Sequence, residues 1–143
     1  MKKILVINGP NLNMLGKRDK SIYGEKSYND LCDYIAKVAM ENGFSVDVFQ
    51  SNHEGDIVDF IQTADQKYKA CVINAAAYTH TSVAIADAVA DSNIPFVEVH
   101  LSDIYSREDF RKISYLAPVC KARYFGNGFE SYKQAILWIK ENI

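Results

Sequence analysis

The sequence predicts an α/β protein in which helices cover both faces of a parallel sheet, a three-layer α/β/α sandwich. Two observations predict this class. Short apolar runs typical of buried strands alternate along the whole chain with longer stretches whose apolar residues recur at helical spacing. Polar residues gather where those strand runs end. A chain of 143 residues can form a core of its own, so we expect one domain over residues 1–143.

Five apolar runs indicate the strands, and they cover residues 2–8, 44–50, 70–75, 95–100 and 119–125. Because a helical stretch separates each run from the next, the strands are expected to lie parallel. The expected strand order is 2-1-3-4-5, which is flavodoxin-like. Sheets of this kind bind ligands outside the carboxyl ends of their strands, so a site is expected at that edge.

Four stretches between and after the strands have apolar residues at the spacing of an amphipathic helix. The first begins at Ser27, with Asp30 three residues later as in a capping box, and ends at Gly43. A brief additional helix is expected over residues 107–113. The four apolar stripes are Leu31, Tyr34, Ile35, Val38 and Ala39; Ile57, Phe60, Ile61, Ala64 and Tyr68; Ile85, Ala88 and Val89; and Tyr132, Ala135, Ile136, Ile139 and Ile143.

Composition limits the partners and the compartment of the protein. Sixteen basic and eighteen acidic residues give a net charge of −2 without a charge block, so no nucleic-acid or membrane partner is expected. The apolar run of residues 1–8 is too short for a signal peptide and lacks a small-residue cleavage site, which favours a first strand. The three cysteines, Cys32, Cys71 and Cys120, are odd in number and far apart, as in a reduced cytoplasmic protein.

Two ionisable residues interrupt the apolar fourth strand. Glu98 and His100 are two positions apart, so their side chains are expected on the same face of the sheet. A glutamate beside a histidine can hold the ring in one orientation and support its protonated form, which prepares a general acid. The alternative is a histidine satisfied at the strand end and a glutamate paired elsewhere. The other two histidines, His53 and His80, also follow strand ends.

Three alternatives to an acid–base site at this edge can be compared with the sequence. A phosphate site is weakly supported, since only residues 126–128, Gly-Asn-Gly before the last helix, resemble an anion cradle. A receiver domain is rejected, because it would need an acidic cluster after the first strand and an aspartate at the third, and this chain has Asn8, Asn11 and Asn74 there. A metal site built from the three histidines is less favoured, because no two have i, i+4 spacing and no cysteine lies nearby.

A basic loop after the first strand has the features of a lid. Gly16 and Gly24 bracket it, and it contains Arg18 and Tyr23. A phenol has a pKa of about 10, and a guanidinium beside its oxygen favours the phenolate. Such a pair can remove a proton from a carbon next to a carbonyl. The alternative is a surface loop with a solvated arginine.

Six motifs occur in order along the chain. They are Ile7-Asn8-Gly9-Pro10-Asn11-Leu12; Arg18 with Tyr23-Gly24; Gln50-Ser51-Asn52-His53-Glu54-Gly55; Asn74-Ala75-Ala76-Ala77-Tyr78-Thr79-His80-Thr81-Ser82; Glu98-Val99-His100-Leu101-Ser102; and Arg107-Glu108-Asp109-Phe110-Arg111. Together they resemble the type II 3-dehydroquinate dehydratases over essentially the whole chain. The resemblance implies a lyase that reversibly converts 3-dehydroquinate to 3-dehydroshikimate through an enolate, in the shikimate pathway, with quinate catabolism the less favoured setting.

The resemblance also implies roles for particular residues. Tyr23 would accept the C2 proton as a phenolate stabilised by Arg18, and Asn11 would hold the enolate through a water. His100, oriented by Glu98, would then protonate the departing C1 hydroxyl. The residues implied in substrate binding are Asn74, His80, Asp87, Leu101, Ser102 and Arg111. No metal or other cofactor is implied.

The family resemblance further implies a homododecamer built as four trimers. Asp87 supports this in part, because it lies off the apolar stripe of its helix and would be free to reach a neighbour's site. Two rival functions stay open at this point. A binding module of the same fold would explain Asn74, His80 and Arg111 but not the lid pair, and a structural subunit would leave the polar edge unexplained.

Overall fold

A five-stranded parallel sheet forms the centre of the molecule. The structure is a computed structural model, and it describes residues 1–17 and 25–143. Its strands are β1 (Lys2–Asn8), β2 (Phe44–Gln50), β3 (Cys71–Asn74), β4 (Phe96–His100) and β5 (Ala122–Phe125). Every neighbouring pair is parallel, and the order is β2-β1-β3-β4-β5, as the sequence predicted.

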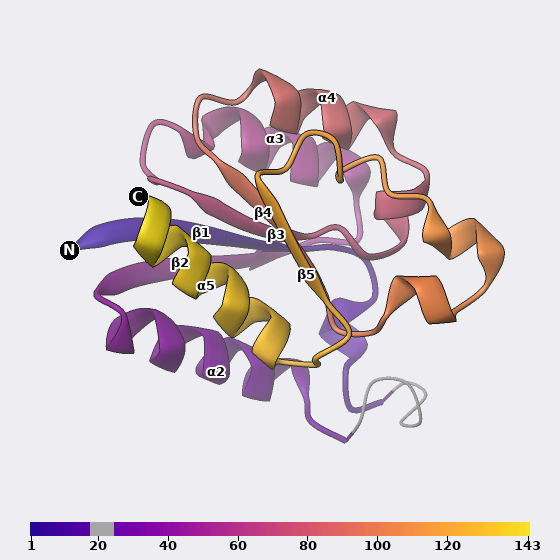
Figure 1. Cartoon of the computed structure of the whole chain (residues 1–143), viewed down its shortest axis with the longest axis horizontal. Helices are drawn as coiled ribbons and strands as arrows, with labels where there is room; N and C mark the ends of the chain where they lie inside the picture. Colours follow the sequence, from indigo (N-terminus) through magenta and orange to yellow (C-terminus); the bar gives the residue numbers. More distant parts are fainter. Residues whose placement is uncertain (18–24) are drawn as a thin grey trace.

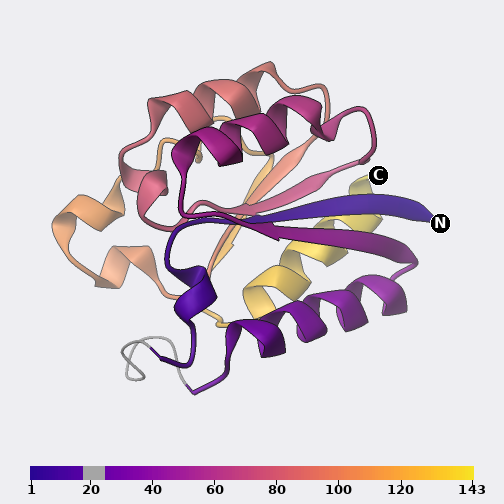
Figure 2. The ribbon, with the colours of Figure 1, turned by 180° about the vertical axis from the view of Figure 1, so that it is seen from behind.

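Two pairs of helices cover the sheet and confirm the three-layer arrangement. The helices α2 (Tyr28–Glu41) and α5 (Glu130–Asn142) lie on one face, and α3 (Glu54–Ala64) and α4 (Val83–Asp91) lie on the other (Figure 1). The view from behind shows the same layers, with the carboxyl ends of the strands at the end of the sheet opposite the two termini (Figure 2).

Alternation along the strands divides the buried residues between two cores. Strand residues facing α2 and α5 include Ile4, Val6, Val72, Val97 and Val99, and those facing α3 and α4 include Leu5, Ile7, Cys71, Ile73 and Phe96. Glu98 and His100 alternate with Val97 and Val99, so they project to the same side as Phe96. This confirms that the two ionisable side chains share one face.

The start and end of α2 follow the signals in the sequence. The Asp30 amide donates to Ser27 Oγ at 3.1 Å, and the Ser27 amide donates to Asp30 Oδ2 at 2.9 Å, which completes the capping box. Gly43 has a φ of 85°, the left-handed conformation in which glycine commonly ends a helix.

The predicted bounds of three elements differ from those in the structure. The last strand was expected from residue 119 but begins at Ala122, because the amides of Val119 and Cys120 both donate to the Leu116 carbonyl and form a turn. The brief helix expected over residues 107–113 is present but shorter, as a 3-10 helix over Asp109–Lys112, and a separate 3-10 helix, Ile104–Ser106, precedes it. Ile143 lies past the end of α5 and is 38% exposed, so it does not extend that helix's buried stripe.

The remaining stripes hold with small changes. Tyr68 is buried although α3 ends at Ala64, because the turn after the helix returns it to the core. In α4, Ala86 is buried beside Ile85 and Val89. Among residues 1–17 and 25–143, none of the helices has the length and apolar character needed to cross a bilayer.

Candidate active site

A pocket opens where β1, β3 and β4 end at their carboxyl ends. Seven of the site residues expected from the sequence line this pocket: Asn11, Asn74, His80, His100, Leu101, Ser102 and Arg111. The rest of the lining is Pro10, Leu12, Ala76, Ala77, Ile104 and Arg107. The topology therefore brings residues from three distant stretches of chain, 10–12, 74–80 and 100–111, to one edge of the sheet, as the strand order requires.

His100 and Glu98 form a buried pair at the inner wall of this pocket. The His100 Nε2 atom lies 2.6 Å from Glu98 Oε2, and the side chains are 6% and 0% exposed. Burial favours the neutral carboxyl, but contacts with His100, Ser114 and Arg123 outweigh it and hold the pKa of Glu98 below its usual value. The carboxylate thus accepts the Nε2 proton, which leaves Nδ1 as the ring nitrogen available to a ligand.

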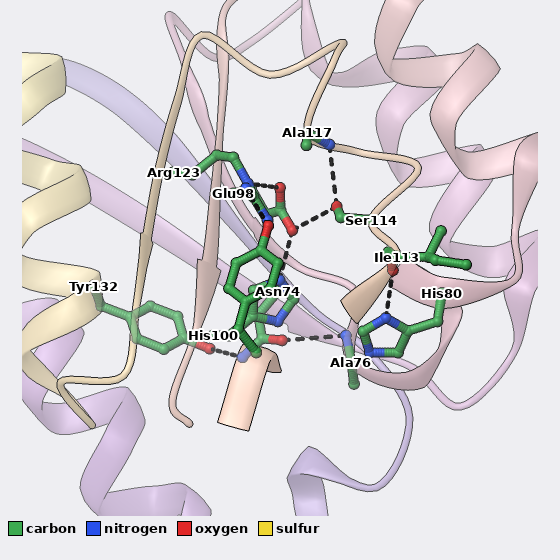
Figure 3. Close-up of polar contacts among 11 residues, drawn as sticks. Asn74, Ala76, His80, Glu98, His100, Ile113, Ser114, Ala117, Arg123 and Tyr132 are labelled. Atoms are coloured by element: carbon green, nitrogen blue, oxygen red, sulfur yellow. Dashed lines mark hydrogen bonds and ion pairs between the residues drawn. The ribbon is translucent and has the colours of Figure 1, made fainter. Parts of the chain in front are cut away.

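The Glu98 carboxylate has further partners that sequence reasoning missed. Arg123 Nε donates to Oε1 at 2.8 Å, and Ser114 Oγ donates to Oε2 at 2.8 Å (Figure 3). The alternative in which glutamate and histidine have separate partners is therefore wrong, although Glu98 does have partners besides His100. A signal for Arg123 existed, because a buried carboxylate needs a cation and β5 is the strand beside β4.

Asn74 is fixed in the floor of the pocket by hydrogen bonds on both ends of its amide. Its Oδ1 accepts from the Ala76 amide at 3.1 Å, and its Nδ2 donates to the Tyr132 hydroxyl at 3.0 Å (Figure 3). The Tyr132 hydroxyl in turn donates to Asn8 Oδ1 at 2.6 Å. Ala76 has a φ of 52°, so the bond to Asn74 stabilises a backbone conformation that alanine rarely adopts. A rigid amide suits the recognition of a hydroxyl.

Replacing Tyr132 by phenylalanine is expected to lower the free energy of unfolding by about 3 kcal/mol, because it leaves Asn8 Oδ1 and an Asn74 N–H buried without this partner. Urea unfolding measures the change. Tyr28→Phe is the matched control, since its hydroxyl is only partly buried and accepts one 3.3 Å bond from Asn8. Its loss is expected to cost about 1 kcal/mol. Equal costs for the two variants would contradict this account.

His80 lies beside His100, with ring centroids 6.4 Å apart. Its Nδ1 donates to the Ile113 carbonyl at 2.6 Å, which makes Nε2 the acceptor. Burial, helped by the nearby His100 and Arg111, holds the pKa of His80 below its usual value. The ring is therefore neutral at pH 7 and suited to accept a hydrogen bond from a ligand hydroxyl.

Two arginines meet at the mouth of the pocket. Arg111 Nε lies 3.1 Å from Glu108 Oε2, and Arg107 Nε lies 3.9 Å from the other oxygen of the same carboxylate. Both arginines line the pocket, and guanidinium groups suit a carboxylate because they can bond both of its oxygens. Arg107 was not among the expected site residues, although it opens the motif that contains Arg111.

Some expected residues are not at the pocket wall. Glu98 lies behind His100, and Asp87 is exposed on α4 without lining the pocket. Arg18 and Tyr23, the expected lid pair, lie outside the described residues. His53 is exposed at the start of α3 and does not line the pocket.

The structure does not support the metal site or the phosphate site considered from the sequence. Within residues 1–17 and 25–143, no three His, Cys, Asp or Glu side chains are arranged to hold a metal ion. The Gly-Asn-Gly loop is poorly suited to hold a phosphate, because two of its three amides are already hydrogen-bonded within the protein. The Gly128 amide donates to the Leu101 carbonyl at 3.0 Å, and the Asn127 amide donates to Ser131 Oγ at 3.2 Å.

Fold and pocket together define a flavodoxin-like α/β protein whose sheet edge carries a histidine bonded to a buried carboxylate, in a pocket that two arginines also line. Side chains of this kind are those of an acid–base enzyme. The model of the family "Dehydroquinase class II" matches residues 2–140, and the chain belongs to that family.

Relatives and solved structures agree with this assignment. The chain is 53% identical over 142 residues to the 3-dehydroquinate dehydratase of Caldicellulosiruptor bescii, covering 99% of this chain and 98% of that protein. The type II dehydroquinase of Butyrivibrio crossotus superposes with a TM-score of 0.94 at 46% identity, covering 96% of this chain and 97% of that one. The type II dehydroquinase of Propionibacterium acnes gives 0.94 at 37% identity, covering 99% and 97%.

Proposed function

We propose that this chain is a lyase that dehydrates 3-dehydroquinate to 3-dehydroshikimate, in the shikimate pathway that leads to chorismate and the aromatic amino acids. Membership of the dehydroquinase class II family supports this activity. The observation that carries it in the structure is the buried Glu98–His100 pair at the wall of a pocket with Arg111 at its mouth. A proton donor and a carboxylate clamp are what the elimination of water from a hydroxy acid requires.

The first step of the reaction is removal of the C2 proton. Tyr23 accepts it as a phenolate, with Arg18 stabilising that charge; these two roles rest on the family resemblance. The electrons left on carbon delocalise into the neighbouring carbonyl and form an enolate. Asn11 is offered as the residue that holds the enolate through a water. Two observations support this role for Asn11. It lines the pocket, and its backbone amide donates a hydrogen bond to Asn52 Oδ1 at 3.0 Å, which holds the residue in place.

The second step is loss of the C1 hydroxyl. His100 donates a proton to that oxygen, the C1–O bond breaks, and the enolate electrons form the C1–C2 double bond. Water leaves with the proton from His100, while Tyr23 holds the proton taken from C2. Glu98 does not take the proton from His100, because its lowered pKa keeps it ionised; it orients the ring and stabilises the imidazolium.

Substrate binding is assigned to the remaining polar groups of the pocket. Arg111 holds the substrate carboxylate together with the backbone amides of Leu101 and Ser102, and His80 and Asn74 bind hydroxyls. All five residues line the pocket, and His80 and Asn74 are held by hydrogen bonds of their own. No cofactor takes part in this scheme.

Assembly into a dodecamer of four trimers is part of the proposal. Asp87 would then reach the site of a neighbouring copy, and its exposure on α4 away from its own pocket is consistent with that role. Large exposed apolar side chains near the pocket, including Phe110 and Ile113, are 62% and 55% exposed and suit an interface. A cytoplasmic location is proposed on the three free cysteines.

Incubating the purified protein with 3-dehydroquinate tests the activity, since the product is a conjugated enone with its own ultraviolet absorbance. We expect the absorbance to rise at the same rate with and without EDTA, and His53→Ala, an exposed position away from the pocket, to behave as the parent. Binding without an absorbance rise would favour a binding module. Inactivation by EDTA that zinc reverses would favour the metal alternative.

A further inference from the structure

A third charged side chain lies behind the Glu98–His100 pair and has no role in the scheme above. Arg123 comes from β5 and bonds the carboxylate oxygen that His100 leaves free, Nε to Oε1 at 2.8 Å. Glu98 is fully buried, and the Arg123 side chain is 23% exposed. Two hydrogen bonds link the three side chains in a row, from the Arg123 guanidinium through the Glu98 carboxylate to the His100 imidazole (Figure 3).

The guanidinium of Arg123 is held firmly in this place. Its Cζ lies 5.7 Å from the ring centroid of Tyr105 and 5.3 Å from that of Phe125. Its Nη1 donates to the Tyr105 hydroxyl at 2.9 Å. Its Nη2 is buried and has no hydrogen-bond partner among the described residues, a cost that the ion pair with Glu98 offsets. A fixed cation in partly buried surroundings acts strongly on its neighbours.

We propose that Arg123 is a positioning residue that neutralises Glu98 and thereby sets the pH at which the Glu98–His100 pair releases its proton. The role of this proton in dehydration rests on the proposed function. A fixed positive charge favours the deprotonated forms of the pair, whichever of the two groups carries the proton. Without Arg123, the lone Glu98 charge would hold the proton on His100 more firmly and make the ring a weaker acid.

Other ionisable groups face the pair and would stay in place in an Arg123 variant. His80 lies beside His100, and Arg111 and Arg107 line the same pocket. Cys120 also lies near Glu98, but burial, aided by the Glu98 charge, raises the pKa of its thiol, so it stays neutral. None of these groups is hydrogen-bonded to Glu98, so within residues 1–17 and 25–143 Arg123 is the arginine that directly contacts this carboxylate.

Proton NMR titration of the histidines in wild type and Arg123→Gln tests the inference. The chain has only three histidines, and His53→Asn and His80→Asn assign the signals. We expect the His100 titration midpoint to rise by about one pH unit in Arg123→Gln, the order of effect of removing a nearby charge at an effective dielectric constant of about 20, reduced for partial exposure. The alkaline limb of kcat/KM should move the same way.

Two matched variants separate charge from structure. Arg123→Lys keeps the cation, and Tyr105→Phe removes the bond to Nη1 but leaves the arginine; both should keep the parent midpoint. A rise in either variant would overturn the charge account even if Arg123→Gln failed to fold. An unchanged midpoint in folded, active Arg123→Gln would overturn the inference and leave the proposed function standing. A raised midpoint in Arg123→Gln, together with a parent protein that does not dehydrate 3-dehydroquinate, would support the inference and reject the proposed function.

Discussion

Replacing His100 by alanine is expected to lower kcat for dehydration by about 10²- to 10⁴-fold, the usual contribution of a positioned general acid. The fold should survive, because Glu98 keeps two of its three donors, Ser114 and Arg123, and the ion pair with Arg123 still compensates its charge. Steady-state kinetics measure the loss, and thermal unfolding checks that the variant is folded. A folded His100→Ala variant with kcat within a few fold of the parent would assign the proton donor elsewhere.

Replacing Tyr23 by phenylalanine is expected to abolish turnover. The change removes only a hydroxyl, so loss of activity would show that the oxygen is needed for chemistry and not for packing. The expected loss lies at or beyond the upper end of about 10²- to 10⁴-fold, since no step can begin without the base. Calorimetry should show that 3-dehydroquinate still binds.

The matched control for this variant is Tyr115→Phe, a tyrosine that is 40% exposed and does not line the pocket. It should keep the parent kcat. A Tyr23→Phe variant with normal kcat would remove Tyr23 from the chemistry and leave the role of His100 to be tested separately.

Much of the fold followed from local pattern. The strand order followed from the alternation of strands and helices, and the capping box followed from Ser27 and Asp30, which lie three positions apart. The errors arose where a local pattern competed with chain geometry. Residues 119–121 are apolar enough for a strand, but the turn closed on the Leu116 carbonyl delays β5 to Ala122.

The candidate site was predictable where one rule covered it. Parallel strands bring their carboxyl ends to one edge, and strand parity placed Glu98 beside His100. The supporting residues were not predictable in this way. Arg123 and Tyr132 lie 25 and 58 residues along the chain from the side chains they hold, Glu98 and Asn74. Such pairings depend on the three-dimensional register of β5 and α5, which no local pattern encodes.

Exchange of the substrate C2 proton with deuterated solvent tests most directly whether the site acts in two separate steps. Nuclear magnetic resonance of 3-dehydroquinate incubated with His100→Ala should show deuterium entering C2 while no enone forms, because the base is intact and the acid is missing. Tyr23→Phe should show neither exchange nor enone. Exchange catalysed by Tyr23→Phe, or its absence in a folded, substrate-binding His100→Ala variant, would contradict the assignment of Tyr23 as base and His100 as acid.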